Sequence, residues 1–560
     1  MKNITSLFAT AAACLVLASG CIKEIDPQTS TVTEEQAGNA PGSFDNFVTA
    51  ITNSLVGSFT YGGSSNYPFD YGYPSFFLMR DVMGQDIAVE DGSWYTTWYS
   101  CGTALGPQYA YCQVPWTYYY GWIKSCNTVI SMAGEEPESD KIEGAGIAYA
   151  MRAMFYMDIA QMYAQQTYTE STEAETVPWV DENTSATDAA NNPRATNEVM
   201  WAHILSDLDK AETYLADYER DDKYTPDISV VYGLKARAYL VMGQWQNARD
   251  YAEKAMSGYT MLTEDEWTSQ TEGFNTPNDA WMFGVTFKST DENILDNDAD
   301  SSWGSQMIIE VSGSGCGYAA NYGYPMRIDY HLYQTIPDTD FRKKSFVDFE
   351  LDNMTEAEAL EALEAYTDDP EGVLATGWQN SATGLLGGLE VKFRPAGGEH
   401  DNQYTAFTVA VPLMRVEEMK LIEAEAAGML NESEGISLLT AFAQTRDPNY
   451  TYGTHTESYG GTATDFQNEV WWQRRVELWG EGFATFDIKR LDKGLIRSYS
   501  NTNHTESYRW NYGDYTTNSG NVHPDWMDLC IVQTETNYNS ACTNNPTPQK
   551  PSSDSSEHVW

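Results

Sequence analysis

The sequence predicts a mostly α-helical protein in which packed helices support a loop-rich half with minor β-structure. Apolar residues recur at helical spacing in two regions, about 115–256 and 406–491. Small residues inside these regions allow close helix packing. The regions at about 60–112 and 261–405 are instead rich in Gly, Asn, Ser and aromatic residues, which is typical of long loops. We therefore expect a helical scaffold with a separate loop-built surface.

The N-terminus has the pattern of a secretion signal. Lys2 precedes a short apolar run at 7–17, which is too short to span a bilayer. Small residues lie directly before Cys21, as in bacterial lipoprotein signals, so we expect lipid on Cys21. The expected order is a signal peptide, a lipidated polar tether and a folded body, at 1–20, 21–42 and 43–560.

Two helices are expected first in the body, at 115–130 and 147–164. In the second stretch Ile147, Met151 and Phe155 recur at helical spacing. Apolar residues with this period bury one face of a helix. These two stretches therefore begin the scaffold.

A helical pair is expected next, at 201–215 and 231–256. Ala248, Ala252 and Ala255 are small residues at offsets that let antiparallel helices approach closely. Tetratricopeptide (TPR) units stack in this way. The match to their consensus is loose, so we describe the predicted scaffold as TPR-like.

The last helical region holds a helix near 414–426 and the charged stretch 474–490. Glu477 and Glu481 lie four residues apart, where like charges on one helical face repel by a few tenths of a kcal/mol. Two readings are open. One is a pair of catalytic carboxylates, as in glycosidases; the other is a structural ion network.

We favour the structural network, because the same stretch supplies the cations that would neutralise the two acids. Arg474 precedes Glu477 by three residues. Lys489 or Arg490 can return from the segment that follows the glycines. The acids are therefore expected to hold the fold together.

The stretch 474–490 resembles the R-x-x-E-L-x-x-E-G-x-R-x-x-D-L-x-R signature of SusD/RagB-family proteins, with Ala484 where the family has its second arginine. The other helical blocks resemble the family's in the same order, so the resemblance covers most of the chain. It implies a SusD-like fold and a non-catalytic lipoprotein of the outer membrane that captures glycans at the cell surface.

The resemblance also implies a partner, a SusC-like TonB-dependent transporter that receives the ligand. Two other functions stay open: peptide capture, as in the RagB branch, and hydrolysis of glycans at the surface. Abundant Asp and Glu are the only support for a hydrolase. Motifs for phosphate binding, zinc binding and nucleophilic catalysis are absent from the sequence.

The chain is strongly acidic, with 32 basic and 81 acidic residues and a formal net charge of −49. Nucleic acids and anionic membrane surfaces bind clustered Lys and Arg, so this charge argues against both as partners. It also disfavours polyanionic glycans. Most of the charge is expected to serve solubility.

Six cysteines remain after Cys14 and Cys21 are set aside, an even number in an exported protein. Cys101 with Cys112, and Cys530 with Cys542, are close enough in sequence to close short loops. Disulfide bonds at these two places are therefore candidates.

The region 261–410 contains two short β-like runs, at 281–287 and 307–311. A short acidic helix is expected at 355–366, and we interpret it as an insertion that is exposed to solvent. The rest consists of turn residues and aromatic residues. This region is expected to carry the ligand site rather than the scaffold.

Aromatic residues in two loops are the main candidates for ligand binding. Flat rings stack on the C–H faces of sugars while their polar edges stay in water. Gly, Ser and Asn flank both clusters, so we expect loops and at least one exposed Trp in each cluster. The candidates are Trp94, Tyr95, Trp98, Trp303, Tyr318 and Tyr322.

A calcium site is a weaker candidate. Asp296, Asp298 and Asp300 have the one-three-five spacing of a calcium loop. Ser301 and Met307 stand where an EF-hand has Gly and Glu, so the stretch is not an EF-hand. We expect no other cofactor.

Overall fold

The computed structural model describes residues 42–58, 67–512, 523–548 and 555–560. The expected signal peptide, most of the tether and Cys21 lie outside the described residues. Contacts between Cα atoms divide the chain into residues 1–46 and residues 47–560. The second unit contains all the helices and strands discussed below except α3 (Ser43–Asn53), which begins in the first.

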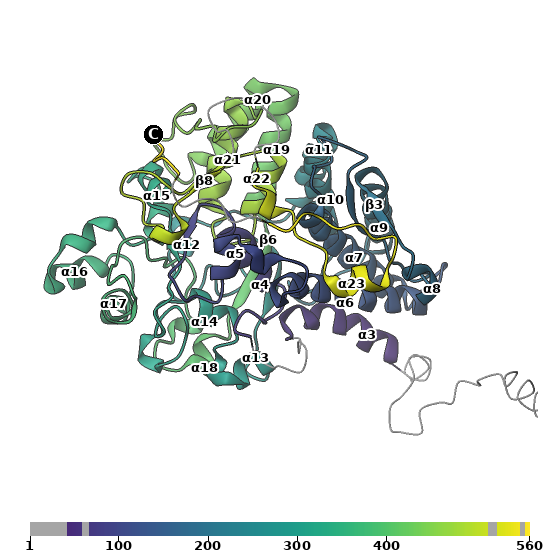
Figure 1. The fold of residues 1–560 in the computed structure, drawn as a ribbon, viewed down its shortest axis with the longest axis horizontal. Coiled ribbons are helices and arrows are strands. Elements are labelled where there is room, and N and C mark those ends of the chain that lie inside the picture. Colours follow the sequence, from purple (N-terminus) through teal and green to yellow (C-terminus); the bar gives the residue numbers. More distant parts are fainter. Residues whose placement is uncertain (1–41, 59–66, 513–522, 549–554) are drawn as a thin grey trace, which may run out of the picture. The chain divides into compact units, whose positions relative to one another are not determined.

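Five long helices form the first part of the scaffold. Each packs on the next in chain order, and the later ones group together in Figure 1. Their packing confirms the expected TPR-like arrangement. They are α6 (Ala110–Ala133), α7 (Ile142–Tyr163), α9 (Asn197–Tyr214), α10 (Ile228–Val241) and α11 (Trp245–Ala255).

The stretch predicted as one helix at 231–256 is two helices. The chain turns at Gly243, whose φ of +66° lies in the left-handed region that glycine adopts at little cost. Ala248, Ala252 and Ala255 on α11 are fully buried. The small residues therefore provide close packing, as expected, with α10 and with a later helix, α19 (Val416–Leu430).

The second part of the scaffold is formed by α19, α20 (Glu432–Ala443), α21 (Asp465–Glu477) and α22 (Ala484–Arg490). Helix α19 packs on α11, α20 and α21. The two helical regions thus join through α11 and α19. Helix α21 begins with a capping box, in which the side chains of Thr464 and Gln467 each accept a hydrogen bond from the other's backbone N–H.

The loop-rich half contains short two-stranded antiparallel pairs. Strand β4 (Trp281–Thr286) pairs with β6 (Ala410–Arg415), which leads directly into α19. The predicted run at 281–287 is therefore a strand. The run at 307–311 is not, because α14 (Trp303–Met307) ends there and the following residues are buried without strand pairing.

The remaining strands also form antiparallel pairs, β1 with β5, β2 with β3 and β7 with β8. Their bounds are Ile87–Ala88 and Arg327–Ile328, Glu175–Pro178 and Arg194–Thr196, and Leu495–Ile496 and Asn511–Tyr512. The shorter helices are α4 (Ser75–Val82), α5 (Thr96–Ser100), α8 (Ala186–Ala189), α12 (Glu264–Trp267), α13 (Glu292–Leu295), α15 (Tyr330–Thr335), α16 (Glu356–Leu363), α17 (Pro370–Leu374), α18 (Gln403–Ala406) and α23 (Gln533–Tyr538).

The acidic helix expected at 355–366 is present as α16, with a capping box at Thr355. It is less solvated than predicted. Ala359 and Leu363 on its inner face are fully buried in an apolar cluster with Val347 and Val373. The helix therefore belongs to a small core of its own, while its acids face outward.

The six cysteines of the described residues are not joined by disulfide bonds, so the two candidate bridges are not formed. The Cys112 thiol instead contacts the carbonyl oxygen of Cys530 at 3.0 Å. Burial raises the pKa of the Cys126 thiol well above its usual range. The five buried cysteines act as small apolar core residues, and Cys316 is half-buried.

The observed fold confirms the predicted class, a mostly helical protein with little β-structure. Within the described part of the chain, no helix combines the length and the apolar character that crossing a membrane requires.

Candidate functional site

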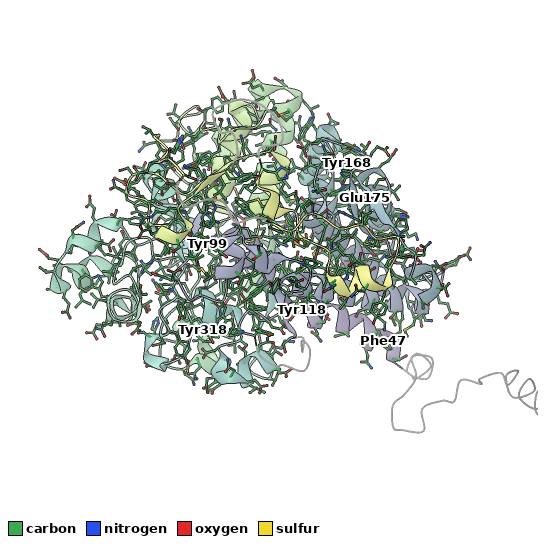
Figure 2. All side chains as sticks on the ribbon, in the orientation of Figure 1. Phe47, Tyr99, Tyr118, Tyr168, Glu175 and Tyr318 are labelled. Atoms are coloured by element: carbon green, nitrogen blue, oxygen red, sulfur yellow. The ribbon has the colours of Figure 1, made fainter. Side chains whose placement is uncertain are left out.

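Two loops predicted to bind ligand come together in the structure. Trp94 follows β1, and Tyr318 and Tyr322 follow α14; Tyr318 is labelled in Figure 2. The ring of Trp94 lies edge-on to Tyr318, with 6.3 Å between ring centroids, and Tyr318 lies 5.2 Å from Tyr322. The loops are more than two hundred residues apart in sequence. Their meeting makes a single aromatic surface.

We call Tyr67, Trp94, Tyr318, Tyr322 and Tyr324 the aromatic platform. Tyr322 is 42% exposed, and the other four rings are half-buried. Half-buried rings suit a sugar-binding surface, because packing fixes them while one face or edge stays open to a ligand.

Glycine shapes the platform at one point. Gly92 has a φ of +95°, and a Cβ atom there would lie 2.9 Å from the ring of Tyr324. A larger residue would strain the backbone and push this ring away. The Asp91–Gly92 turn thus allows the Trp94 loop to lie directly against the tyrosine loop.

Acidic groups lie beside the exposed phenols. Burial and the neighbouring Asp300 carboxylate raise the pKa of Tyr322 above its usual range. Asp300 also accepts a hydrogen bond from the Gly317 N–H at 2.7 Å. Tyr404, which is 40% exposed, donates its hydroxyl to Asp298 at 2.9 Å. These carboxylates orient phenol groups at the edge of the platform.

Three predicted binding residues are not at the surface. Tyr95, Trp98 and Trp303 are 0%, 2% and 0% exposed, so they cannot stack on a ligand. Tyr95 precedes α5 and Trp98 lies on it, and their helical spacing turns both rings inward. Trp303 begins α14 and packs edge-on against Phe393 at 4.8 Å. The expectation of an exposed tryptophan in the second cluster is therefore wrong.

The three aspartates considered for calcium do not form one ligand set. Asp298 accepts a hydrogen bond from the Tyr404 hydroxyl, and Asp300 accepts one from the backbone N–H of Gly317. The only described His, Cys, Asp and Glu side chains that bring three ligand atoms within 4.8 Å of one another belong to a different group. The geometry at Asp296 thus gives no support for a calcium site.

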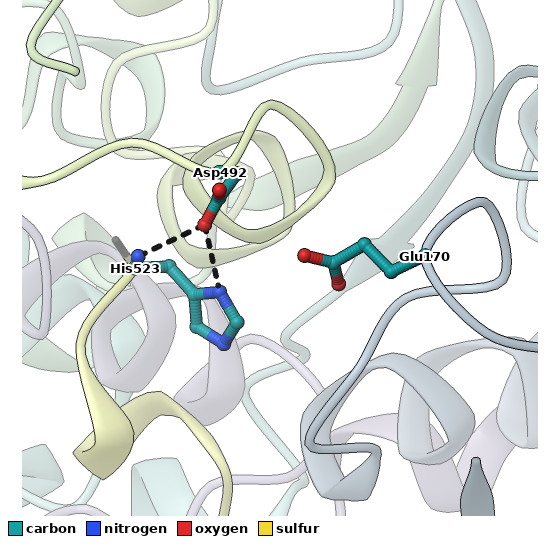
Figure 3. Close-up of side chains that lie close together, drawn as sticks. All are labelled: Glu170, Asp492 and His523. Carbon is teal, nitrogen blue, oxygen red and sulfur yellow. Dashed lines mark hydrogen bonds and ion pairs between the residues drawn. The ribbon is translucent and has the colours of Figure 1, made fainter. Parts of the chain in front are cut away.

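That other group contains Glu170, Asp492 and His523, shown in Figure 3. One imidazole nitrogen of His523 lies 3.3 Å from Asp492, and the other lies 3.5 Å from Asp528. Burial opposes a charge on His523, but its bonds to the two aspartates outweigh this and raise its pKa to about 9. A protonated histidine therefore already balances the buried acids.

A large pocket lies beside the platform. Its volume is about 1070 Å³, and its wall includes Glu90 and Asp91, just before the Trp94 loop. Ligand pockets usually have volumes of about 300–1,000 Å³, so this one can hold several sugar units. Tyr330 and Phe349 contribute half-buried rings to its wall.

Glu477 and Glu481 form a buried ion network, as predicted. They are 0% and 4% exposed. Glu477 ends α21 and Glu481 lies in the following turn, so they do not share one helical face as expected. Because both are enclosed and paired, they cannot meet a glycan as catalytic carboxylates.

The cations of this network were predicted wrongly. Arg342 and Arg446 each approach Glu477 to 3.1 Å, and Arg415 contacts both glutamates. Lys392 lies 2.7 Å from Glu481. Burial alone would raise the pKa of Glu477, but Arg446, Arg415 and Arg342 lower it to about 2.

The predicted cations neutralise other acids. Arg474 pairs with Asp487 at 2.7 Å, Arg490 pairs with Glu425 at 2.6 Å, and Lys489 pairs with Asp528 at 2.7 Å. The charged stretch 474–490 therefore connects several parts of the fold through buried ion pairs. Proximity in sequence did not reveal which acid each cation would meet.

The sequence also did not reveal the pocket residues. Asp91–Gly92 was a recognisable turn signal, but Tyr330 and Phe349 carry no local signal of exposure. Tyr330 begins α15, and Phe349 lies in a short 3₁₀ turn. They face the pocket because distant segments converge there.

The structure thus combines a helical scaffold with an aromatic surface built from loops. Residues 74–240 match a family described as starch-binding and associating with the outer membrane. Residues 244–547, more than half of the chain, match the SusD family. The chain belongs to the SusD/RagB family.

Solved structures agree on the fold. A SusD-like carbohydrate binding protein from Bacteroides vulgatus is 22% identical, with a TM-score of 0.65, over 91% of this chain and 98% of that one. A SusD superfamily protein from the same species is 16% identical, with a TM-score of 0.67, over 90% and 98%. Surface glycan-binding protein A from Bacteroides thetaiotaomicron, in complex with laminarihexaose, is 16% identical, with a TM-score of 0.62, over 90% and 99%. No curated protein matches the chain.

Proposed function

We propose that this protein is a non-catalytic, lipid-anchored glycan-binding protein of the outer-membrane surface. The main support for this proposal is the aromatic platform, in which two distant loops present half-buried rings on one surface. The family relationship supports the same function, and a relative with the same fold is known in complex with laminarihexaose. Ring faces of the platform would stack on sugars while neighbouring polar groups bond to hydroxyls.

We also propose that the glycan passes to a SusC-like TonB-dependent transporter. This partner is inferred from the family alone. A cross-linking experiment on native outer membranes would test it. Recovery of the transporter with this protein supports the proposal, and recovery of the protein alone, under conditions that capture known pairs, contradicts it.

Substitution of platform rings tests the binding function. Calorimetry on a panel of soluble oligosaccharides, beginning with laminarihexaose and maltohexaose, identifies a binder. Trp94→Ala and Tyr322→Ala should each weaken binding by roughly tenfold, because one stacked ring contributes about 1–2 kcal/mol. Tyr538→Ala is a matched control, since Tyr538 is 82% exposed and lies outside the platform.

Two outcomes would contradict the proposal. If both platform variants bind like the parent, the rings do not hold the glycan. If incubation with the glycan releases shorter products, the protein is a hydrolase. Chromatography of the same calorimetry samples distinguishes binding from cleavage.

A further inference from the structure

The large pocket beside the platform has an acidic wall. Six carboxylates line it, against three cationic side chains. The acids are Glu90, Asp91, Asp338, Asp348, Glu350 and Asp352, and the cations are Arg327, Lys343 and Arg509.

The cations are engaged by the protein itself. Arg327 is 4% exposed and donates to the carbonyl oxygens of Gly387 and Leu385 at 2.9 and 2.8 Å. It also lies 3.4 Å from Glu90. Burial lowers the pKa of Arg327, and Glu90 opposes this effect. This guanidinium thus supports the wall and is not directed at a ligand.

The other two cations are similarly engaged. Arg509 donates to the carbonyl oxygen of His504 at 2.7 Å. Lys343 pairs with Asp338 at 2.6 Å and lies over the ring of Tyr333, 4.8 Å from its centroid. Arg327 and Lys343 are therefore paired with the carboxylates of Glu90 and Asp338, and Arg509 is held by a carbonyl oxygen.

The acids remain in excess around the cavity. Asp91 and Glu350 are exposed, and Asp348 and Asp352 are half-buried. Asp348 and Asp352 accept hydrogen bonds from neutral groups, namely the Tyr333 hydroxyl and the N–H of Gly387. Such bonds leave the negative charge in place. A concave wall with an excess of negative charge concentrates cationic ligands and repels anionic ones.

Aromatic rings lie within the same wall. Tyr330 and Phe349 are half-buried and meet edge-on, with 4.9 Å between ring centroids. Rings bind the C–H faces of sugars and also attract ammonium groups through their negative faces. Carboxylates and rings together suit a sugar that bears a positive charge.

We propose that this pocket binds oligosaccharide units with protonated amino groups, as in glucosamine oligomers, and rejects chains that carry carboxylate or sulfate. The inference rests on the proposed function, since it names the chemical class of the captured glycan. Ionic attraction to the wall would add to ring stacking for a cationic chain. For an anionic chain the same wall is repulsive.

Three hexasaccharides test the proposal on the full chain. They are the glucosamine hexamer, its fully N-acetylated counterpart and hexagalacturonate, measured by calorimetry at about pH 5.5, where Asp and Glu are ionised. We expect the amine hexamer to bind at least about tenfold more tightly than the acetylated one at low salt. This ratio should fall as salt rises. Hexagalacturonate should not bind measurably.

A double variant assigns the effect to the pocket. Asp91→Asn combined with Glu350→Gln changes two exposed acids, and the ratio of the two affinities should fall towards one. Glu361→Gln is the control, since Glu361 is an exposed acid on α16 and does not line the pocket. It should keep the ratio of the parent.

The outcomes separate this inference from the proposed function. Equal affinity for the amine and acetylated hexamers, with binding that depends on Trp94, overturns the inference alone. Failure of every glycan in the panel to bind overturns both. Binding of an oligolysine peptide in place of the amine hexamer also overturns the inference and points to peptide capture.

Discussion

Glu477 is a carboxylate held in complete burial by three guanidinium groups. Burying a charge costs several kcal/mol, and here the surrounding cations offset that cost. Removing the acid would take one carboxylate from a cluster of three buried arginines, which would keep only Asp340, Glu417 and Glu481 as partners. The residue is therefore expected to matter for stability rather than for ligand binding.

Glu477→Gln should lower the free energy of unfolding by about 3–5 kcal/mol, the usual effect of breaking a buried ion pair. Urea denaturation followed by tryptophan fluorescence measures this change. Glu361→Gln, on the exposed face of α16, should change it by less than about 0.5 kcal/mol. If the two variants unfold at the same urea concentration, the structural role of Glu477 is contradicted.

His523 predicts a specific pH dependence. Its folded pKa is about 9, raised by Asp492 and Asp528, while an unfolded histidine titrates near 6.5. Because the folded pKa is the higher one, the stabilisation is complete below about pH 6.5 and disappears as pH rises through 9. This stabilisation amounts to about 3 kcal/mol.

The difference in unfolding free energy between the parent and His523→Gln measures this effect, since other titrating groups cancel. The difference should be largest near about pH 6 and should shrink towards pH 9.5. Glu170 and Lys489 also lie near this group, so the experiment is best done at constant ionic strength. A difference in unfolding free energy that stays constant from about pH 6 to pH 9.5 would show that His523 is not charged in the folded protein.

Single-residue exposure was the least predictable property of the aromatic clusters. Trp94 and Trp98 have the same type of sequence neighbourhood, but one is half-buried and the other is in the core. The short helix α5 decides the difference, because it turns every third or fourth residue inward. The flanking Gly and Ser predicted the loop but could not predict this one turn.

At the scale of elements, helix existence was predictable and helix ends were not. Helical periodicity located α7 and α9, since a repeated apolar face is a strong signal. The break between α10 and α11 and the end of α21 before Glu481 were missed. A glycine with a left-handed φ lies at each place, Gly243 between α10 and α11 and Gly480 after the end of α21.

Helices α19 and α20 meet at two glycines. A Cβ atom at Gly435 would lie 2.2 Å from the backbone of Gly428. Such an approach is possible only without side chains. The crossing also places the ring of Phe466, from α21, against Gly428.

Gly435→Ala should therefore destabilise the protein by about 1–3 kcal/mol, although alanine is normally the better helix former. Thermal unfolding by circular dichroism measures the change. Gly57→Ala is the control, because its added Cβ would have ordinary contacts, 3.5 Å to the nearest atom. A melting temperature for Gly435→Ala equal to that of the control would mean that the helices can separate without cost.

At the scale of the whole molecule, the order of weak motifs was informative. Each helical block alone is a loose match, but the same order along the chain predicted the fold that the family matches confirm. Loop geometry could not be predicted, because the platform joins segments more than two hundred residues apart. Contacts of that kind arise from the assembled scaffold and leave no local pattern.

Anchoring is also a property of the whole molecule. Cys21→Ala should abolish lipidation, since Cys21 follows the small residues of a lipoprotein signal. The protein should then be found in the soluble periplasmic fraction, with unchanged glycan binding in solution. Metabolic labelling with a fatty acid and fractionation of membranes measure this. A labelled variant that still fractionates with the outer membrane would contradict the assignment.

The ion network around Glu477 has a consequence for how such chains can diversify. Its members lie between residues 342 and 481, and Arg342 and Glu477 are 135 residues apart. A hybrid of two relatives whose junction falls within this stretch would receive acids and cations that were not selected together. Viable exchange between relatives should therefore be concentrated in the surface loops, so that ligand preference changes while the charged interior is inherited as one block.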